Sequence, residues 1–142
     1  MLIDELKNIA RNNGIVGAGG AGFPAYAKMT EKADTVILNC VECEPLLKLH
    51  RQLLATHTEE IIQMLDEVRE SFGAKEAVIG IKSEYVTTIK AIEEVIGDFP
   101  NVRICALKAA YPMGDEVVLI YEATGRVIKP GGLPIDENVV VY

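Results

Sequence analysis

Cysteine is scarce in this sequence, with only 3 residues in a chain of 142. So few cysteines, and an odd number of them, cannot form the disulfide framework of a small secreted domain. The low cysteine count agrees with a reducing compartment. Long apolar runs are lacking as well, since none approaches the roughly 20 residues that span a bilayer. The N-terminus has neither the basic nor the apolar region of a secretion signal. We therefore expect a cytoplasmic protein with no direct membrane insertion.

Positive charge is the second shortage, because 14 Lys and Arg residues stand against 21 Asp and Glu, for a net charge of -7. Nucleic acids and anionic membranes are held mainly by Lys and Arg, so both are poor partners for this chain. Hydrophobic residues make up 49% of the sequence and charged residues 25%, a balance typical of a protein with a buried core. The length suits a single domain over residues 1–142 and is too short for two.

Hydrophobic periodicity predicts alternating strands and helices. The expected elements are helices over residues 2–12, 58–72, 85–96 and 115–124, and strands over residues 35–39, 76–82, 102–107 and 139–141. The Thr58 hydroxyl stands where it could cap a helix, and Gly73 and Gly125 stand where helices should end. Strand and helix in alternation predict an α/β fold with a mostly parallel sheet of about four strands.

A glycine-rich loop follows the first helix, and its glycines at positions 17, 19 and 22 satisfy the spacing G-x-G-x-x-G. Such glycines let main-chain N–H groups approach a phosphate or an aromatic ring. The dinucleotide fingerprint requires a strand before the loop, whereas a helix precedes this one, and Pro24 disturbs the helix that should follow. A phosphate-binding P-loop is excluded because no Gly-Lys-Ser/Thr triplet is present. A flexible hinge is the alternative interpretation.

Two side chains next to this loop have the chemistry of a binding site. Phe23 could stack on a planar ligand or pack onto the core as a plug. Lys28 could reach a phosphate held over the glycines or lie at the surface.

An acidic segment, residues 39–45 (NCVECEP), follows the first predicted strand. Open α/β sheets bind ligands at the carboxyl ends of their strands. Glu42 and Glu44 share one side if the segment is extended, where they could accept hydrogen bonds from ribose hydroxyls and favour NAD over NADP. The alternative is a solvated acidic loop.

Cys40 and Cys43 form a C-x-x-C pair, a spacing shared by zinc half-sites and dithiol redox centres. A structural zinc needs four ligands and no second pair exists, so we predict no metal site. Glu44 opposes a thiolate, which leaves buried free thiols as the default and a thiol–disulfide reductase as a weaker alternative. Three cysteines also cannot hold an iron–sulfur cluster alone.

A second acidic segment, residues 111–116 (YPMGDE), joins the third predicted strand to the next helix. Asp115 and Glu116 lie in the first turn of that helix, where negative charge suits the helix dipole, and this alone would explain them.

Four segments occur in the order found in the RnfC component of the Rnf electron-transport complex. They are residues 14–24 (GIVGAGGAGFP), 39–45 (NCVECEP), 111–116 (YPMGDE) and 131–134 (GGLP). The same core resembles the FMN- and NADH-binding domain of the flavoprotein subunit of respiratory complex I. The arrangement is most similar to Rnf-C-like soluble reductases.

The resemblance implies a three-layer Rossmann-like domain that binds FMN and NADH and uses no catalytic side chain. Residues implied around the flavin and its phosphate are Gly17, Gly19, Gly20, Gly22, Lys28, Asn39, Glu42 and Cys43. Residues implied to face NADH are Phe23 and Glu44. The second acidic loop adds Gly114, Asp115 and Glu116.

The implied function is NADH oxidation, with hydride passing from NADH to FMN and single electrons then passing to iron–sulfur clusters. Family members carry those clusters in segments beyond Tyr142, so the chain is expected to be a fragment or module of a longer electron-transfer protein. Its expected partners are other domains or subunits of such a complex, which can be peripheral to a membrane. The alternative, from another class, is a non-catalytic nucleotide-binding or interaction module.

Overall fold

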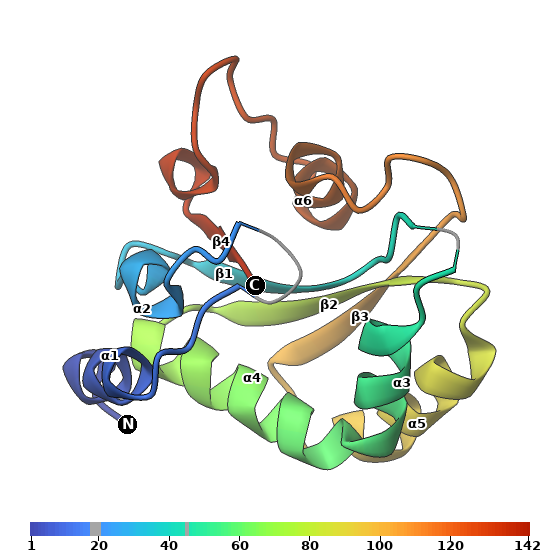
Figure 1. Ribbon diagram of the computed structural model, residues 1–142, viewed down its shortest axis with the longest axis horizontal. Coiled ribbons are helices and arrows are strands. Elements are labelled where there is room, and N and C mark those ends of the chain that lie inside the picture. The colour runs from blue at the N-terminus through green and yellow to red at the C-terminus, as the bar shows by residue number, and fades with distance from the viewer. Residues whose placement is uncertain (18–20, 45) are drawn as a thin grey trace.

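The computed structural model describes residues 1–17, 21–44 and 46–142. Four strands form one parallel sheet in the order β3-β2-β1-β4 (Figure 1). The elements along the chain are α1 (Ile3–Asn12), α2 (Ala25–Lys28), β1 (Thr35–Cys40), α3 (Leu49–Thr56), α4 (Thr58–Phe72), β2 (Glu76–Lys82), α5 (Val86–Ile96), β3 (Val102–Leu107), α6 (Glu116–Thr124), the 3-10 helix η1 (Pro134–Glu137) and β4 (Val139–Val141). This confirms the predicted α/β class.

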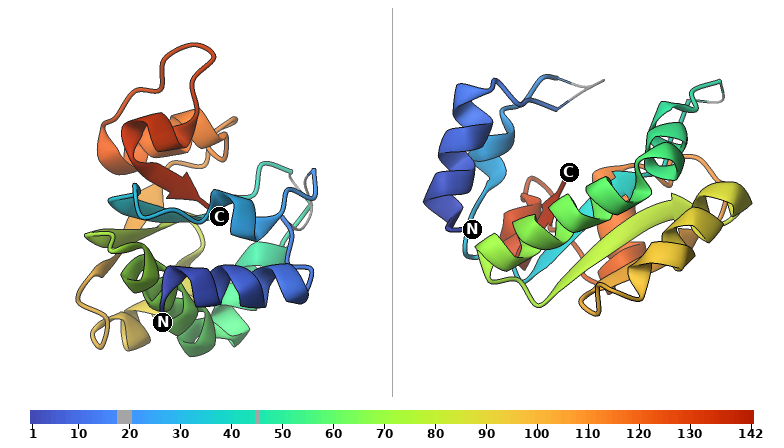
Figure 2. Two further views of the ribbon diagram at one scale, coloured as in Figure 1. Left: turned by 90° about the vertical axis from the view of Figure 1, so that its left-hand side faces the viewer. Right: turned by 90° about the horizontal axis from the view of Figure 1, so that it is seen from below.

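Helices cover both faces of the sheet, which makes the domain three-layered (Figures 1 and 2). On one face, α1, α3, α4 and α5 bury apolar side chains such as Ile62, Phe72 and Ile92 against the strands. On the other face, α6 contributes Leu119 and Ile120. The inner strand β2 faces both layers, which explains why its sequence is an almost unbroken apolar run.

The order of the strands reverses beside β1. The chain lays down β1, β2 and β3 in one direction, and then crosses the opposite face through α6 to add β4 on the other side of β1. Such a reversal is a topological switch point, where open α/β sheets bind ligands beyond the carboxyl ends of the strands. The fold therefore places its natural binding crevice between the ends of β1 and β4.

Most predicted elements are confirmed to within a residue or two at each end. The predicted ends of α4 and α6 are confirmed as well, since Gly73 and Gly125 follow these helices with left-handed φ angles of 69° and 74°. The predicted cap at Thr58 is wrong. Its hydroxyl donates to the carbonyl of Leu54 at 2.7 Å, because α3 ends just before α4 begins and leaves its last carbonyls within reach. The sequence pattern did not delimit α2, α3 or η1.

An ion pair ties the start of β1 to the segments around β4. The Arg126 guanidinium lies 2.6 Å from the Asp34 carboxylate and also donates to the Glu137 carbonyl at 2.8 Å. Partial burial works to raise the pKa of Asp34, but hydrogen bonds from Arg126 and Thr35, with the nearby positive charges, outweigh it and hold that pKa below its usual value. The pair thus helps to fix β4 beside β1.

Replacing Leu119 with Ala should lower the free energy of unfolding by about 2–5 kcal/mol, because the side chain is fully buried between α6 and the sheet. Val117→Ala, on the exposed side of the same helix, should change it by less than about 0.5 kcal/mol. Urea denaturation followed by circular dichroism measures both. Equal losses for the two variants would contradict the packing described for α6.

The Asp34–Arg126 pair predicts a pH-dependent stability difference between the wild type and Asp34→Asn. Because the pKa of Asp34 is depressed below its usual 3.8, its contribution is fully present above that pH and is lost as the pH falls below it. The wild type should be more stable near neutral pH by about 1 kcal/mol or less, and the gap should close in acid. Denaturation curves across this range test it, and a gap unchanged at low pH would refute it.

Candidate functional site

The carboxyl ends of β1 and β4 are joined through Tyr142. The Tyr142 carbonyl accepts a hydrogen bond from the Asn39 N–H at 2.7 Å, and the Tyr142 N–H donates to the Ile37 carbonyl at 2.9 Å. Its phenol donates to the Ala25 carbonyl at 3.2 Å, and burial raises the pKa of this phenol well above its usual range. One residue therefore fixes α2 at the switch point.

Lys28 and Phe23 lie on the same side of this junction. The Lys28 ammonium donates to the Val141 carbonyl at 3.0 Å and lies 5.8 Å from the ring centres of both Phe23 and Tyr142. Phe23 remains 51% exposed, so it is not a plug packed into the core. A cation and an accessible aromatic ring thus stand together beside the end of β4.

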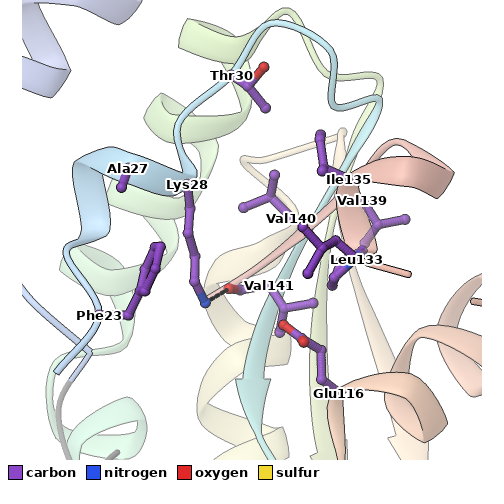
Figure 3. Close-up of a pocket in the computed structure, with 11 residues that line it drawn as sticks. Phe23, Ala27, Lys28, Thr30, Glu116, Leu133, Ile135, Val139, Val140 and Val141 are labelled. Carbon is purple, nitrogen blue, oxygen red and sulfur yellow. Dashed lines mark hydrogen bonds between the residues drawn. The ribbon is translucent and has the colours of Figure 1, made fainter. Parts of the chain in front are cut away.

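A cavity of about 440 Å³ opens next to these side chains (Figure 3). Its lining residues are Phe23, Ala27, Lys28, Thr30, Glu116, Leu133, Pro134, Ile135, Val139, Val140 and Val141. Phe23 comes from the flank of the glycine loop, Lys28 from the end of α2, and Glu116 from the start of α6 (Figure 3). The cavity therefore brings together residues that are far apart in the sequence.

The flanks of the glycine loop form a short antiparallel hairpin. Val16 bridges Pro24, and the Gly17 N–H donates to the Phe23 carbonyl at 2.9 Å. Gly22 has a φ of 68°, a conformation that other residues rarely adopt. The other two implied glycines, Gly19 and Gly20, lie outside the described residues.

The two acidic loops meet through Gly114. The Asn39 amide donates to the Gly114 carbonyl at 3.1 Å. A Cβ at position 114 would clash with the Val41 carbonyl oxygen and stand only 2.7 Å from the Cys43 sulfur, so only glycine allows this close approach. Beside this contact, the Asp115 carboxylate caps α6 by accepting the Val117 N–H at 3.0 Å. This contact agrees with the interpretation, drawn from the sequence, that Asp115 stabilises the start of the helix.

Glu42 and Glu44 have different surroundings, although the sequence suggested a shared side if the segment were extended. Glu42 is only 5% exposed, and one carboxylate oxygen accepts the His50 N–H in the first turn of α3 at 2.8 Å. Its other carboxylate oxygen has no hydrogen-bond partner among the described residues. The Glu42 main-chain carbonyl accepts a hydrogen bond from the Lys82 ammonium at 2.5 Å. The Glu44 side chain, by contrast with that of Glu42, is exposed to solvent. Within this loop, Glu44 is therefore the carboxylate open to a ligand from solution.

The C-x-x-C pair consists of free thiols. Burial, with the charge of Glu42 adding to it, raises the pKa of the Cys40 thiol to about 12. A thiol in that state is protonated at neutral pH, which argues against dithiol chemistry. Among residues 1–17, 21–44 and 46–142, no group of three or more His, Cys, Asp or Glu side chains is arranged to hold a metal ion.

Several contributors to this region were not predicted from the sequence, among them Tyr142, Lys82 and the lining strand β4. Tyr142 and Lys82 lie at or near the carboxyl ends of strands, which is the signal that could have found them. The candidate residues named from the sequence follow the first and third strands, whereas Lys82 and Tyr142 lie at the ends of the second and fourth. None of the helices in the described part of the chain is long and apolar enough to cross a membrane.

A family model described as the Nuo51 FMN-binding domain matches residues 10–142. The chain belongs to this family. The resemblance drawn from the four sequence segments is thereby confirmed.

Curated relatives of this Nuo51 FMN-binding domain include the "Cobalamin reductase PduS" of Citrobacter freundii, 39% identical over 136 residues. That match covers 96% of this chain and 30% of the relative. Another is a component of the Na(+)-translocating ferredoxin:NAD(+) oxidoreductase complex of Acetobacterium woodii, 36% identical over 142 residues, covering 97% of this chain and 32% of the relative. The chain thus spans about a third of these relatives.

The fold also matches a solved structure, a chain of an NAD+-reducing [NiFe]-hydrogenase in the air-oxidized state. The TM-score is 0.80 at 24% identity, with 98% of this chain and 28% of the hydrogenase chain covered. This likeness confirms the three-layer α/β architecture.

The cavity and loops of this Nuo51 FMN-binding domain fit a flat, phosphorylated cofactor. The volume of about 440 Å³ lies within the range of roughly 300–1,000 Å³ found for small-molecule sites. Phe23, Lys28 and Glu116 line the cavity, while Asn39, Cys43 and Gly114 do not line it and meet at the contact between the two acidic loops. Of the implied residues, Glu42 points toward α3 instead.

Alkylation of the folded protein should label Cys43 well before Cys40. With a pKa of about 12 against the usual 9.0, the thiolate fraction of Cys40 is reduced about a thousandfold, and the side chain is also buried. Iodoacetamide labelling followed by peptide mass spectrometry gives the order, and urea-unfolded protein provides the control in which all three cysteines react. Rapid labelling of Cys40 in the folded state would contradict its described environment.

Proposed function

We propose that this chain binds FMN at the β1/β4 switch point and forms the NADH-oxidising module of a longer electron-transfer protein. The observation that carries the proposal is the convergence, at one switch point, of the glycine-loop flank, the loop after β1 and the start of α6. Membership of the Nuo51 FMN-binding domain family supports the choice of FMN.

The residues around the cavity suit separate parts of the cofactor. The Lys28 ammonium provides positive charge for the phosphate. The Asn39–Gly114 contact fixes the spacing of the two loops on which the flavin ring would rest. Glu116, which lines the cavity, supplies an acceptor for hydroxyl or ring N–H groups.

Two exposed side chains suit NADH. Phe23 offers half of its surface for stacking on a nicotinamide ring. The Glu44 carboxylate is open to solvent and suits ribose hydroxyls while repelling a 2′-phosphate, which favours NADH over NADPH.

The bound flavin would supply the redox chemistry, taking a hydride from NADH and releasing electrons singly toward iron–sulfur clusters in other segments. The protein's part is to hold the two rings together and to exclude water, so no side chain need act as an acid or a base. Relatives named as components of ion-translocating oxidoreductase complexes support partners of that kind and a place at the periphery of such a complex.

The proposal is tested by titrating the purified chain with FMN and following flavin fluorescence. The wild type should bind saturably, and Gly114→Ala should weaken binding at least about tenfold, because the new methyl group forces the two acidic loops apart. Gly97→Ala is the matched control, since a Cβ there meets nothing within 4 Å.

Circular dichroism must show that both variants are folded. Absence of FMN binding by the folded wild type would refute the proposal and favour a non-catalytic module. Equal affinity in all three proteins would place the cofactor elsewhere. With FMN bound, anaerobic addition of NADH should bleach the flavin absorbance.

A further inference from the structure

Lys82 is the last residue of β2 and lies beside the loop that follows β1. The two strands run parallel, with Cys40 paired to Ile81, so their carboxyl ends lie side by side (Figure 1). The Lys82 side chain is half-buried, and its ammonium donates a hydrogen bond to the main-chain carbonyl of Glu42. The side chain therefore reaches from the end of one strand to the loop that follows its neighbour.

The charge of Lys82 has little else to interact with. In the described part of the chain, no Asp or Glu side chain forms an ion pair with it. Its second neighbour is the ring of Tyr85, which is only 7% exposed and whose centre lies 5.9 Å from the ammonium. Hydrogen bonds from a charged donor are roughly twice as strong as those between neutral groups. The contact with the Glu42 carbonyl is therefore the principal use of this cation within residues 1–17, 21–44 and 46–142.

The residue that Lys82 holds is also fixed through its side chain. The Glu42 carboxylate accepts the His50 N–H at 2.8 Å, while the carbonyl of the same residue accepts from Lys82. The next residue, Cys43, lies against Gly114, where the two acidic loops meet. Lys82 thus fixes the peptide group that leads directly into the contact between these loops.

We propose that Lys82 is a positioning residue for FMN, which fixes the loop after β1, residues 39–44, through the Glu42 carbonyl. The inference rests on the proposed function and adds to it a residue that does not line the cavity. Groups that bind a cofactor must be held to within about 0.5 Å by supporting contacts, and a cation on a main-chain carbonyl is a contact of this kind. Lys82 acts through the main chain of Glu42, not by touching the cofactor.

The first test measures the position of the loop without any cofactor. Lys82→Met keeps an unbranched apolar stem but removes the charged donor, so the released loop should let iodoacetamide label Cys43 at least about threefold faster. Loss of a positive charge does not by itself promote a thiolate, so faster labelling reports movement of the loop. Cys105, on β3, is the internal standard and should be labelled at the wild-type rate.

The second test is FMN affinity, measured by flavin fluorescence. Lys82→Met should weaken binding about tenfold, the effect of losing one charge-assisted hydrogen bond that holds the loop. Lys82→Arg keeps a charged donor and should restore both the affinity and the slow labelling of Cys43. Lys90→Met is the matched control, because it removes the same charge from an exposed position on α5 and should leave both properties unchanged.

Urea denaturation must show that the variants are folded, and Lys82→Gln takes the place of Lys82→Met if the latter is not. The assignment is overturned if Cys43 keeps its wild-type rate in the neutral variant, or if Cys43 and Cys105 accelerate together, which would report general destabilisation. Faster labelling of Cys43 with unchanged FMN affinity, or failure of Lys82→Arg to restore either property, would overturn it as well.

The labelling experiment also separates this inference from the proposed function. If the folded wild type binds no FMN, the proposed function is refuted, while the rates for Cys43 still show whether Lys82 holds the loop. If the wild type binds FMN and Lys82→Met binds it equally well, the positioning role of Lys82 alone is refuted.

Discussion

The pairing of β4 with β1 is the constraint on which the rest of the site depends. Because β4 returns to the side of β1 away from β2, the strand order reverses there and the helices divide between the two faces. Tyr142 extends the pairing to Asn39 and carries it to α2 through its phenol. Without that strand, the cavity would lack Val139, Val140 and Val141 from its wall, and Lys28 would lack its carbonyl partner.

Two glycines allow segments of the chain to pack closely against each other. At Gly80, in the middle of β2, a Cβ would stand 2.7 Å from a methyl carbon of Leu119, so the glycine lets α6 lie directly on the sheet. At Gly114 the same absence of a side chain lets the two acidic loops touch. One glycine sets the thickness of a layer and the other sets the spacing of loops at the site.

The fold was predictable because its signals are local. The apolar β-branched runs of β1 and β2, and glycines such as Gly73 behind the helices, report directly on burial and on helix ends. The site was less predictable because its decisive contacts are not local. Nothing near Glu42 in the sequence reveals that its carboxylate is used by α3, and nothing near Thr58 reveals that its hydroxyl turns back toward Leu54. Tyr142 contributes through partners more than a hundred positions away.

The hydrogen bond between Tyr142 and Ala25 joins an early segment of the chain to the residue that follows its last strand. A chain leaving the ribosome presents α1, the glycine loop and α2 first, and β4 is the last of the four strands to emerge. The early segments can pack on α4, but α2 gains its contacts with Val141 and Tyr142 only after β4 has been translated and paired. The wall of the cavity that β4 and Lys28 form is therefore complete only once the last strand of the sheet is in place.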